Sequence, residues 1–212
     1  MTLVLPEAQG ATRLVLVRHA EPEESAAGRC YGRLDVALSD QGRRQAEELA
    51  ALLSPLPPAA VYSSPLRRAL ETAAPIAAAR GLSPIVHDGL RELDFGEVEG
   101  MRFEDIAVER PALFRSWMDA PAEVSFPGGE SLPELRDRAL AAASEIRLGH
   151  EGETVAVVAH GGVVRVVLGD ALGLSDGAIF RLDQAYGAVS VVDWLGGTPV
   201  VRAVNVAYTR AR

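Results

Sequence analysis

The sequence contains no lysine, because all 21 of its basic residues are arginine. This absence excludes a Schiff-base lysine, a P-loop lysine and a pyridoxal phosphate site. Cysteine is almost absent as well, since Cys30 is the single one among 212 residues. One cysteine cannot form an intramolecular disulfide, which is typical of a protein in a reducing compartment. We therefore expect the protein in the cytoplasm.

Long hydrophobic runs and a positive net charge are also missing. No stretch approaches the roughly 20 apolar residues that a membrane-crossing helix needs, and the opening MTLVLPEAQGATR lacks the basic and then apolar layout of a secretory signal. With 29 acidic residues the formal net charge is -8, the wrong sign for attraction to nucleic acid or to an anionic membrane. We expect neither of them as a partner.

What the chain does have is the composition of an ordinary globular protein, with 48% hydrophobic and 24% charged residues. Its length predicts one domain over residues 1–212, with residues 1–12 as a flexible tail.

Short apolar runs predict strands, and serines before periodic segments predict where helices begin. The expected strands are residues 13–17, 59–62, 84–86, 154–159, 188–194 and 199–204. Helices are expected from N-caps at Ser39, Ser64 and Ser131, and again after His160. Pro65 is expected at the first position of the second helix, and Pro75 is expected to kink or end it. This alternation of strands and helices predicts an α/β sandwich with a largely parallel sheet.

Two of the four histidines occupy matching places. His19 directly follows the first apolar strand, and His160 directly follows the strand TVAVVA. Since ligands bind beyond the carboxyl ends of strands in open α/β sheets, these two side chains are expected to converge on one pocket. For His87 and His150 we favour structural roles.

Arginines beside these histidines suit an oxyanion. Arg18 adjoins His19, and Arg68 is placed in the first turn of a helix, where backbone N–H groups already favour negative charge. The planar guanidinium can hold a phosphate with two hydrogen bonds. For Arg67, Arg80 and Arg110 a solvated surface charge is the favoured interpretation.

Six segments occur in a fixed order: LVRHAEP, GRCYGRLDVALSDQGRRQA, SSPLRRALETA, LRELDFGEVEG, FPGGESLPELRDR and VVAHGG. In this order and at these distances they resemble the histidine phosphatase superfamily, and the resemblance covers nearly the whole chain. It implies a three-layer α/β/α sandwich with a mostly parallel, phosphoglycerate mutase-like sheet. It also implies that residues 101–130 form a cap over the active site.

The resemblance also assigns roles to residues. His19 is implied as the nucleophile that takes the phosphoryl group, with Arg18 as a phosphate ligand. Arg68 and His160 are implied to complete the phosphate pocket, and His160 counts among the catalytic residues. Glu92 is the implied proton donor to the leaving oxygen. No metal and no cofactor are implied.

Further substrate contacts are predicted around this set. Ser25 lies where many members of the family carry an asparagine that touches the phosphate, and Ala20 replaces the usual glycine. Gly161, in the HGG motif, is another candidate contact. Arg29 and Arg33 are candidates for the distal anion of the substrate, with surface charge as the alternative.

The predicted function is metal-independent hydrolysis of a small-molecule phosphate ester through phosphohistidine. The loop GRCYGRLD resembles that of α-ribazole phosphatases, so α-ribazole 5'-phosphate is one candidate substrate. A phosphoglycerate mutase and a non-catalytic phospho-ligand binding protein are the alternative functions. A homodimer is the candidate oligomeric state. Phe114, Trp117 and Phe126 are candidate lid residues, although core packing is the favoured role of each.

Overall fold

The computed structural model describes residues 5–8 and 10–207. Its strands are β1 (Thr12–Arg18), β2 (Ala60–Ser63), β3 (Ile85–Val86), β4 (Thr154–Ala159), β5 (Val189–Leu195) and β6 (Thr198–Val206). Its α-helices are α1 (Asp40–Leu52), α2 (Arg67–Ala78), α3 (Phe103–Glu109), α4 (Pro111–Asp119), α5 (Leu132–Gly149) and α6 (Gly161–Ala171). Short 3-10 helices are η1 (Glu24–Ala26), η2 (Asp88–Leu90), η3 (Gly96–Val98) and η4 (Ala178–Arg181).

All six strands form one sheet in the order β3-β2-β4-β1-β5-β6. The pairs β1–β4, β2–β4 and β2–β3 are parallel, whereas β5 runs antiparallel to both β1 and β6. The tight turn at Gly196-Gly197 allows the last antiparallel pair, because both glycines have positive φ. The predicted α/β sandwich with a mostly parallel sheet is confirmed.

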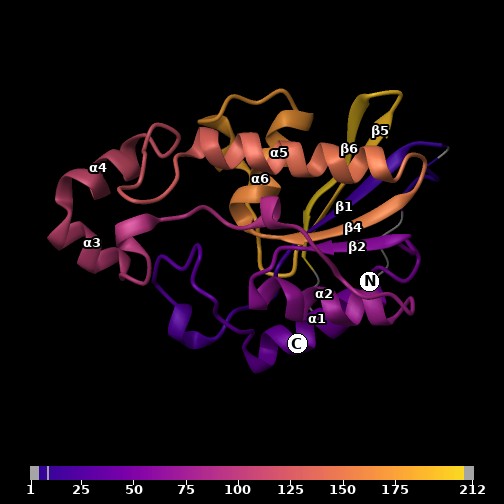
Figure 1. Ribbon diagram of the computed structural model, residues 1–212, viewed down its shortest axis with the longest axis horizontal. Helices are drawn as coiled ribbons and strands as arrows, with labels where there is room; N and C mark the ends of the chain where they lie inside the picture. Colours follow the sequence, from indigo (N-terminus) through magenta and orange to yellow (C-terminus); the bar gives the residue numbers. More distant parts are fainter. Residues whose placement is uncertain (1–4, 9, 208–212) are drawn as a thin grey trace.

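Helices cover both faces of the sheet, α5 on one side and α1 with α2 on the other (Figure 1). Successive residues of β1 point to opposite faces: Leu14 and Leu16 pack with α5 and α6, while Val15 and Val17 pack with α1 and α2. Both faces of the strand are therefore buried, which explains its continuous apolar sequence.

Two predicted helix starts are confirmed by their caps. The Ser39 hydroxyl accepts a hydrogen bond from the Gly42 N–H at the start of α1. Ser131 and Glu134 form a reciprocal capping box at the start of α5.

The start of α2 was predicted wrongly. The helix begins at Arg67, after Leu66, and has no side-chain cap. Ser64 instead makes a tertiary contact, because its hydroxyl lies within hydrogen-bond distance of His160 Nε2. The helix also continues beyond Pro75 to Ala78, so of the two predicted effects of Pro75, a kink or an end, the end is excluded. Burial of Ala73, Ile76 and Ala77 against the sheet offsets the hydrogen bond that proline cannot donate.

Residues 101–126 leave the sheet as predicted and form α3 and α4 at one end of the molecule (Figure 1). A separate apolar cluster lies beneath these helices, containing Cys30, Val98, Ile106, Val124 and Phe126. Phe114 and Trp117 pack against it, and the Trp117 and Phe126 rings meet edge to face at 5.0 Å. Core packing, the favoured role of these aromatics, is what the contacts show.

The predicted tail, residues 1–12, lies partly outside the described residues. Within the described part, Leu5 packs against the core and Thr12 is the first residue of β1. Among the helices described, none is long and apolar enough to span a membrane.

Candidate active site

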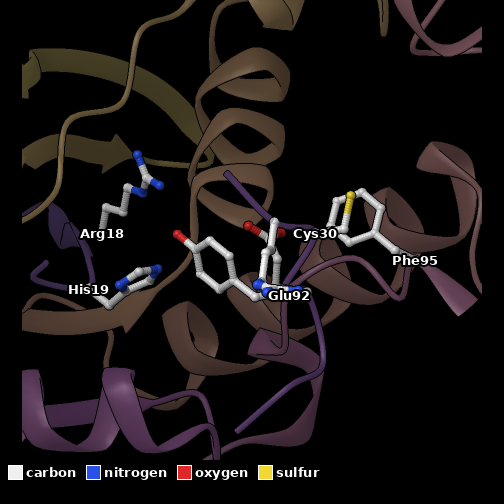
Figure 2. Close-up of a pocket in the computed structure, with 8 residues that line it drawn as sticks. Arg18, His19, Cys30, Glu92 and Phe95 are labelled. Carbon is white, nitrogen blue, oxygen red and sulfur yellow. The ribbon is translucent and has the colours of Figure 1, made fainter. Parts of the chain in front are cut away.

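The two matched histidines converge at the ends of adjacent parallel strands. His19 follows β1 and His160 follows β4, and their ring centroids lie 5.2 Å apart. His19 borders a cavity of about 150 Å³. The lining residues are Arg18, His19, Arg29, Cys30, Tyr31, Gly32, Glu92 and Phe95 (Figure 2).

One hydrogen bond fixes the tautomer of His19. Its Nδ1 lies 2.8 Å from the carbonyl oxygen of Ala20. Because a carbonyl can only accept, Nδ1 carries the proton, and the lone pair of the neutral ring is on Nε2. This geometry presents Nε2 as a nucleophile.

His160 is buried beside it and keeps one ring nitrogen free. Its Nε2 lies 2.8 Å from the Ser64 hydroxyl oxygen. Its Nδ1 is buried and has no hydrogen-bond partner among the described residues. Such a nitrogen is available to a bound ligand.

Two arginines extend this set of free nitrogens. Arg68, on α2, is 0% exposed, and its terminal nitrogens donate to the carbonyls of Gly32 and Leu34 at 2.8 and 2.7 Å. Arg18, at the end of β1, donates through Nη1 to the Gln184 carbonyl. The Nε atoms of Arg18 and Arg68 are buried and unpartnered within the described structure. The arrangement is suited to binding an anion.

Glu92 is held at the N-terminus of α6. Its Oε2 accepts from the Gly162 N–H at 3.1 Å, and its Oε1 accepts from the Leu93 N–H at 3.0 Å. A Cβ at position 162 would lie 2.3 Å from Oε1, so only glycine permits this approach. The carboxyl group borders the same cavity as His19.

Burial and positive charge determine the protonation of the histidines. Burial lowers the pKa of His19 well below 6.5, and Arg68 and Arg18 lower it further. Burial, followed by Arg68, His19 and Arg18, lowers the pKa of His160 in the same direction. Both rings are therefore neutral at neutral pH. Burial raises the pKa of the Cys30 thiol to about 12, so this thiol stays protonated and does not compete as a nucleophile.

The lowered histidine pKa values predict a loss of stability on acidification. As pH falls through 6.5, the unfolded chain binds protons at His19 and His160 while the folded protein does not. The free energy of unfolding should then decrease by up to about 1.4 kcal/mol per pH unit for each histidine. Urea unfolding from pH 7.5 to pH 5 measures this slope. The variant His19→Gln should give a shallower slope than the parent, and equal slopes would contradict the prediction.

Of the four other predicted substrate contacts, Arg29 and Gly161 lie at the site, whereas Arg33 and Ser25 do not line the cavity. Arg29 lines the cavity and donates to the Gly100 carbonyl at 2.7 Å. Gly161 is the first residue of α6, where a Cβ would lie 3.6 Å from Arg18 Nε. Arg33 instead pairs with Glu130 at 3.0 Å. Ser25 is exposed on η1 and does not belong to the cavity lining.

Sequence reasoning missed two tyrosines at the site. Tyr31 lines the cavity, and its hydroxyl oxygen lies 2.6 Å from that of Tyr186. The position of Tyr31 next to Gly32, in the quoted loop motif, was an available signal. No sequence signal identified Tyr186, because only the fold brings its hydroxyl next to that of Tyr31.

Comparisons with known proteins agree with this geometry. The family model for the histidine phosphatase superfamily (branch 1) matches residues 14–207. Phosphoserine phosphatase 1 of Hydrogenobacter thermophilus is 41% identical over 92% of each chain. A metal-independent phosphoserine phosphatase of Arabidopsis thaliana is 36% identical over 74% of this chain and 67% of its own. Among solved structures, the mycobacterial glucosyl-3-phosphoglycerate phosphatase superposes with a TM-score of 0.84 at 27% identity, covering 93% of this chain and 100% of that one.

Proposed function

The chain belongs to the histidine phosphatase superfamily and is a phosphoric monoester hydrolase acting on small phosphate esters, and we propose that it works through a phosphohistidine on His19 without a metal ion. One observation carries this proposal. A neutral imidazole with a free Nε2 lies beside three buried nitrogens that have no partner among residues 5–8 and 10–207, which are Nε of Arg18, Nε of Arg68 and Nδ1 of His160.

In the first step, His19 Nε2 attacks phosphorus in line with the ester oxygen. The N–P bond forms and the P–O bond to the leaving group breaks, while Arg18, Arg68 and His160 stabilise the charge on the equatorial oxygens. Glu92, in its protonated form, gives its proton to the leaving oxygen.

In the second step, the Glu92 carboxylate takes a proton from water as the water oxygen attacks phosphorus. The N–P bond breaks, its electron pair returns to Nε2, and inorganic phosphate leaves. The residues supply orientation, a proton relay and positive charge, which are the parts that phosphoryl transfer requires.

Two substrates are proposed for comparison. The loop carrying Cys30, Tyr31 and Gly32 forms part of the cavity, which supports α-ribazole 5'-phosphate through its resemblance to that group of phosphatases. The relatives at 41% and 36% identity support O-phosphoserine. Measuring kcat/KM for both esters in parallel decides between them.

Residues 101–130 are the proposed cap. Their apolar cluster reaches the cavity directly, because Cys30 belongs to the cluster and Phe95 packs against it while both line the cavity. The cytoplasm is the proposed compartment, and a homodimer is the proposed assembly.

The test of the function is phosphate release in EDTA. We expect p-nitrophenyl phosphate to be hydrolysed at an unchanged rate, and vanadate to inhibit strongly, because its trigonal-bipyramidal form mimics the in-line transition state. Activity lost in EDTA and restored by Mg²⁺ or Zn²⁺ would overturn the metal-free mechanism. No turnover of any phosphate ester would favour the non-catalytic binding protein.

The mutase alternative is tested with 3-phosphoglycerate, with and without 2,3-bisphosphoglycerate. A mutase must retain a highly charged bisphosphate and exclude water from its phosphohistidine, whereas this chain has no lysine and places Glu92 beside the nucleophile's cavity. We expect free phosphate to form without 2-phosphoglycerate. Faster formation of 2-phosphoglycerate than of phosphate would identify a mutase.

A further inference from the structure

Tyr31 and Tyr186 form a pair beside the nucleophile that the mechanism above does not use. Their hydroxyl oxygens are 2.6 Å apart. The centroid of the His19 ring lies 5.5 Å from that of Tyr186 and 6.3 Å from that of Tyr31. Tyr31 carries the one hydroxyl group among the described residues that line the cavity.

Each tyrosine ring also faces one of the two phosphate-site arginines. The Arg18 guanidinium carbon lies 4.0 Å from the centroid of Tyr186, and that of Arg68 lies 5.0 Å from the centroid of Tyr31. Each ring therefore lies against a guanidinium whose Nε is buried and unpartnered within the described residues.

The backbone around Tyr31 is anchored on both sides. Cys30 exchanges hydrogen bonds with the 100–101 segment, donating to the Met101 carbonyl at 3.0 Å and accepting from the Gly100 N–H at 2.6 Å. The Gly32 carbonyl accepts from Arg68 at 2.8 Å. These contacts fix the position of Tyr31 relative to the Arg68 side chain.

The Tyr31 hydroxyl is a neutral donor under all conditions near neutral pH. Burial raises its pKa above the usual value, and the hydrogen bond to Tyr186 raises it further. Arg18 and Arg68 act on it in the opposite direction, which places the oxygen within their electrostatic reach.

The tyrosine pair has one hydroxyl proton that it can donate to a ligand. Two hydroxyls hold two protons, and their mutual hydrogen bond uses one of them. A phosphoryl oxygen can only accept, so a chain can run from the Tyr186 hydroxyl to the Tyr31 oxygen and from the Tyr31 hydroxyl to the phosphoryl group. Hydrogen bonds in such a chain strengthen one another.

We propose that the Tyr31 hydroxyl donates a hydrogen bond to a phosphoryl oxygen bound at His19, and that Tyr186 positions this hydroxyl. Tyr31 is then a substrate-binding residue of this site, and Tyr186 is a positioning residue. The proposal rests on the proposed function for the identity of the anion that the site takes.

The test uses Tyr31→Phe, Tyr186→Phe and the double variant, with Tyr62→Phe as the matched control. The Tyr62 hydroxyl pairs with His150 at 3.2 Å and lies outside the cavity lining. The readouts are calorimetric binding of inorganic phosphate, inhibition by vanadate, and KM and kcat for p-nitrophenyl phosphate.

We expect Tyr31→Phe to weaken phosphate binding about tenfold, the factor that corresponds to about 1.4 kcal/mol. Tyr186→Phe should weaken it less, and the double variant should match Tyr31→Phe, because removing Tyr186 has no effect once its partner hydroxyl is gone. Tyr62→Phe should behave as the parent.

Parent-like phosphate binding by Tyr31→Phe, fully additive losses, or faster turnover by either variant would overturn the proposal. Faster turnover would identify the pair as a barrier to entry. Failure of the proposed function is a separate result, since it would appear as no phosphate release by the parent protein. Phosphate binding would then still test the role of Tyr31.

Discussion

Replacing His19 with alanine should reduce kcat by a factor on the order of 10⁶, because the variant has no group to form the covalent bond to phosphorus. The fold should survive, since His19 directly follows β1, its ring bonds only to the neighbouring Ala20 carbonyl within the described structure, and its backbone bonds to Ala159 and Gly187 remain. Circular dichroism and thermal unfolding check the fold. Steady-state phosphate release checks the activity.

The same experiment can show the intermediate directly. Protein quenched during turnover of labelled substrate should lose its label in acid and keep it in alkali, as expected for a phosphoramidate. His87→Ala is the matched control, because His87 is half-buried, contacts Glu145 and Gly89, and lies outside the cavity lining. Turnover by His19→Ala near the parent rate, or label with the stability of a serine ester, would refute the role of His19.

Replacing Glu92 with glutamine should reduce kcat by about 10²- to 10⁴-fold, the usual contribution of a general acid and base. The amide has nearly the same shape and can still accept from the Leu93 or Gly162 N–H. It cannot protonate the leaving oxygen or take a proton from water. The change therefore removes the proton transfers while preserving most of the packing.

The leaving group gives this variant a distinctive signature. With p-nitrophenyl phosphate the departing phenolate needs little protonation, so the first step should be less impaired than hydrolysis of the phosphohistidine. Rapid-mixing kinetics should show a burst of nitrophenol followed by slow turnover. Glu97→Gln is the control, because Glu97 lies in the same acidic segment but pairs with Arg110 on the surface. Parent-like turnover by Glu92→Gln would assign the acid to another residue.

Local chemistry made much of the fold readable from the sequence. The caps at Ser39 and Ser131 are confirmed because each is complete within three residues. The strands 13–17 and 154–159 are confirmed because burial on both faces leaves continuous apolar runs. The family assignment is confirmed because the family model matches residues 14–207, a range that includes all six segments on which the resemblance depends.

Tertiary structure decided what depends on distant partners. The sequence reading predicted α2 to start at Ser64, but Ser64 lies against His160, which is 96 residues away in sequence. It could not specify that β5 runs antiparallel beside β1, because an apolar run looks alike in either direction and no short turn joins these two strands.

The site shows the same division. Sequence motifs identified the charged groups, which carry their chemistry in their residue type. The fold decided that Arg33 pairs with Glu130, that Ser25 remains exposed, and that Tyr31 meets Tyr186 across 155 residues of sequence. Such contacts depend on how loops from separate strands approach one another, and no local periodicity encodes that approach.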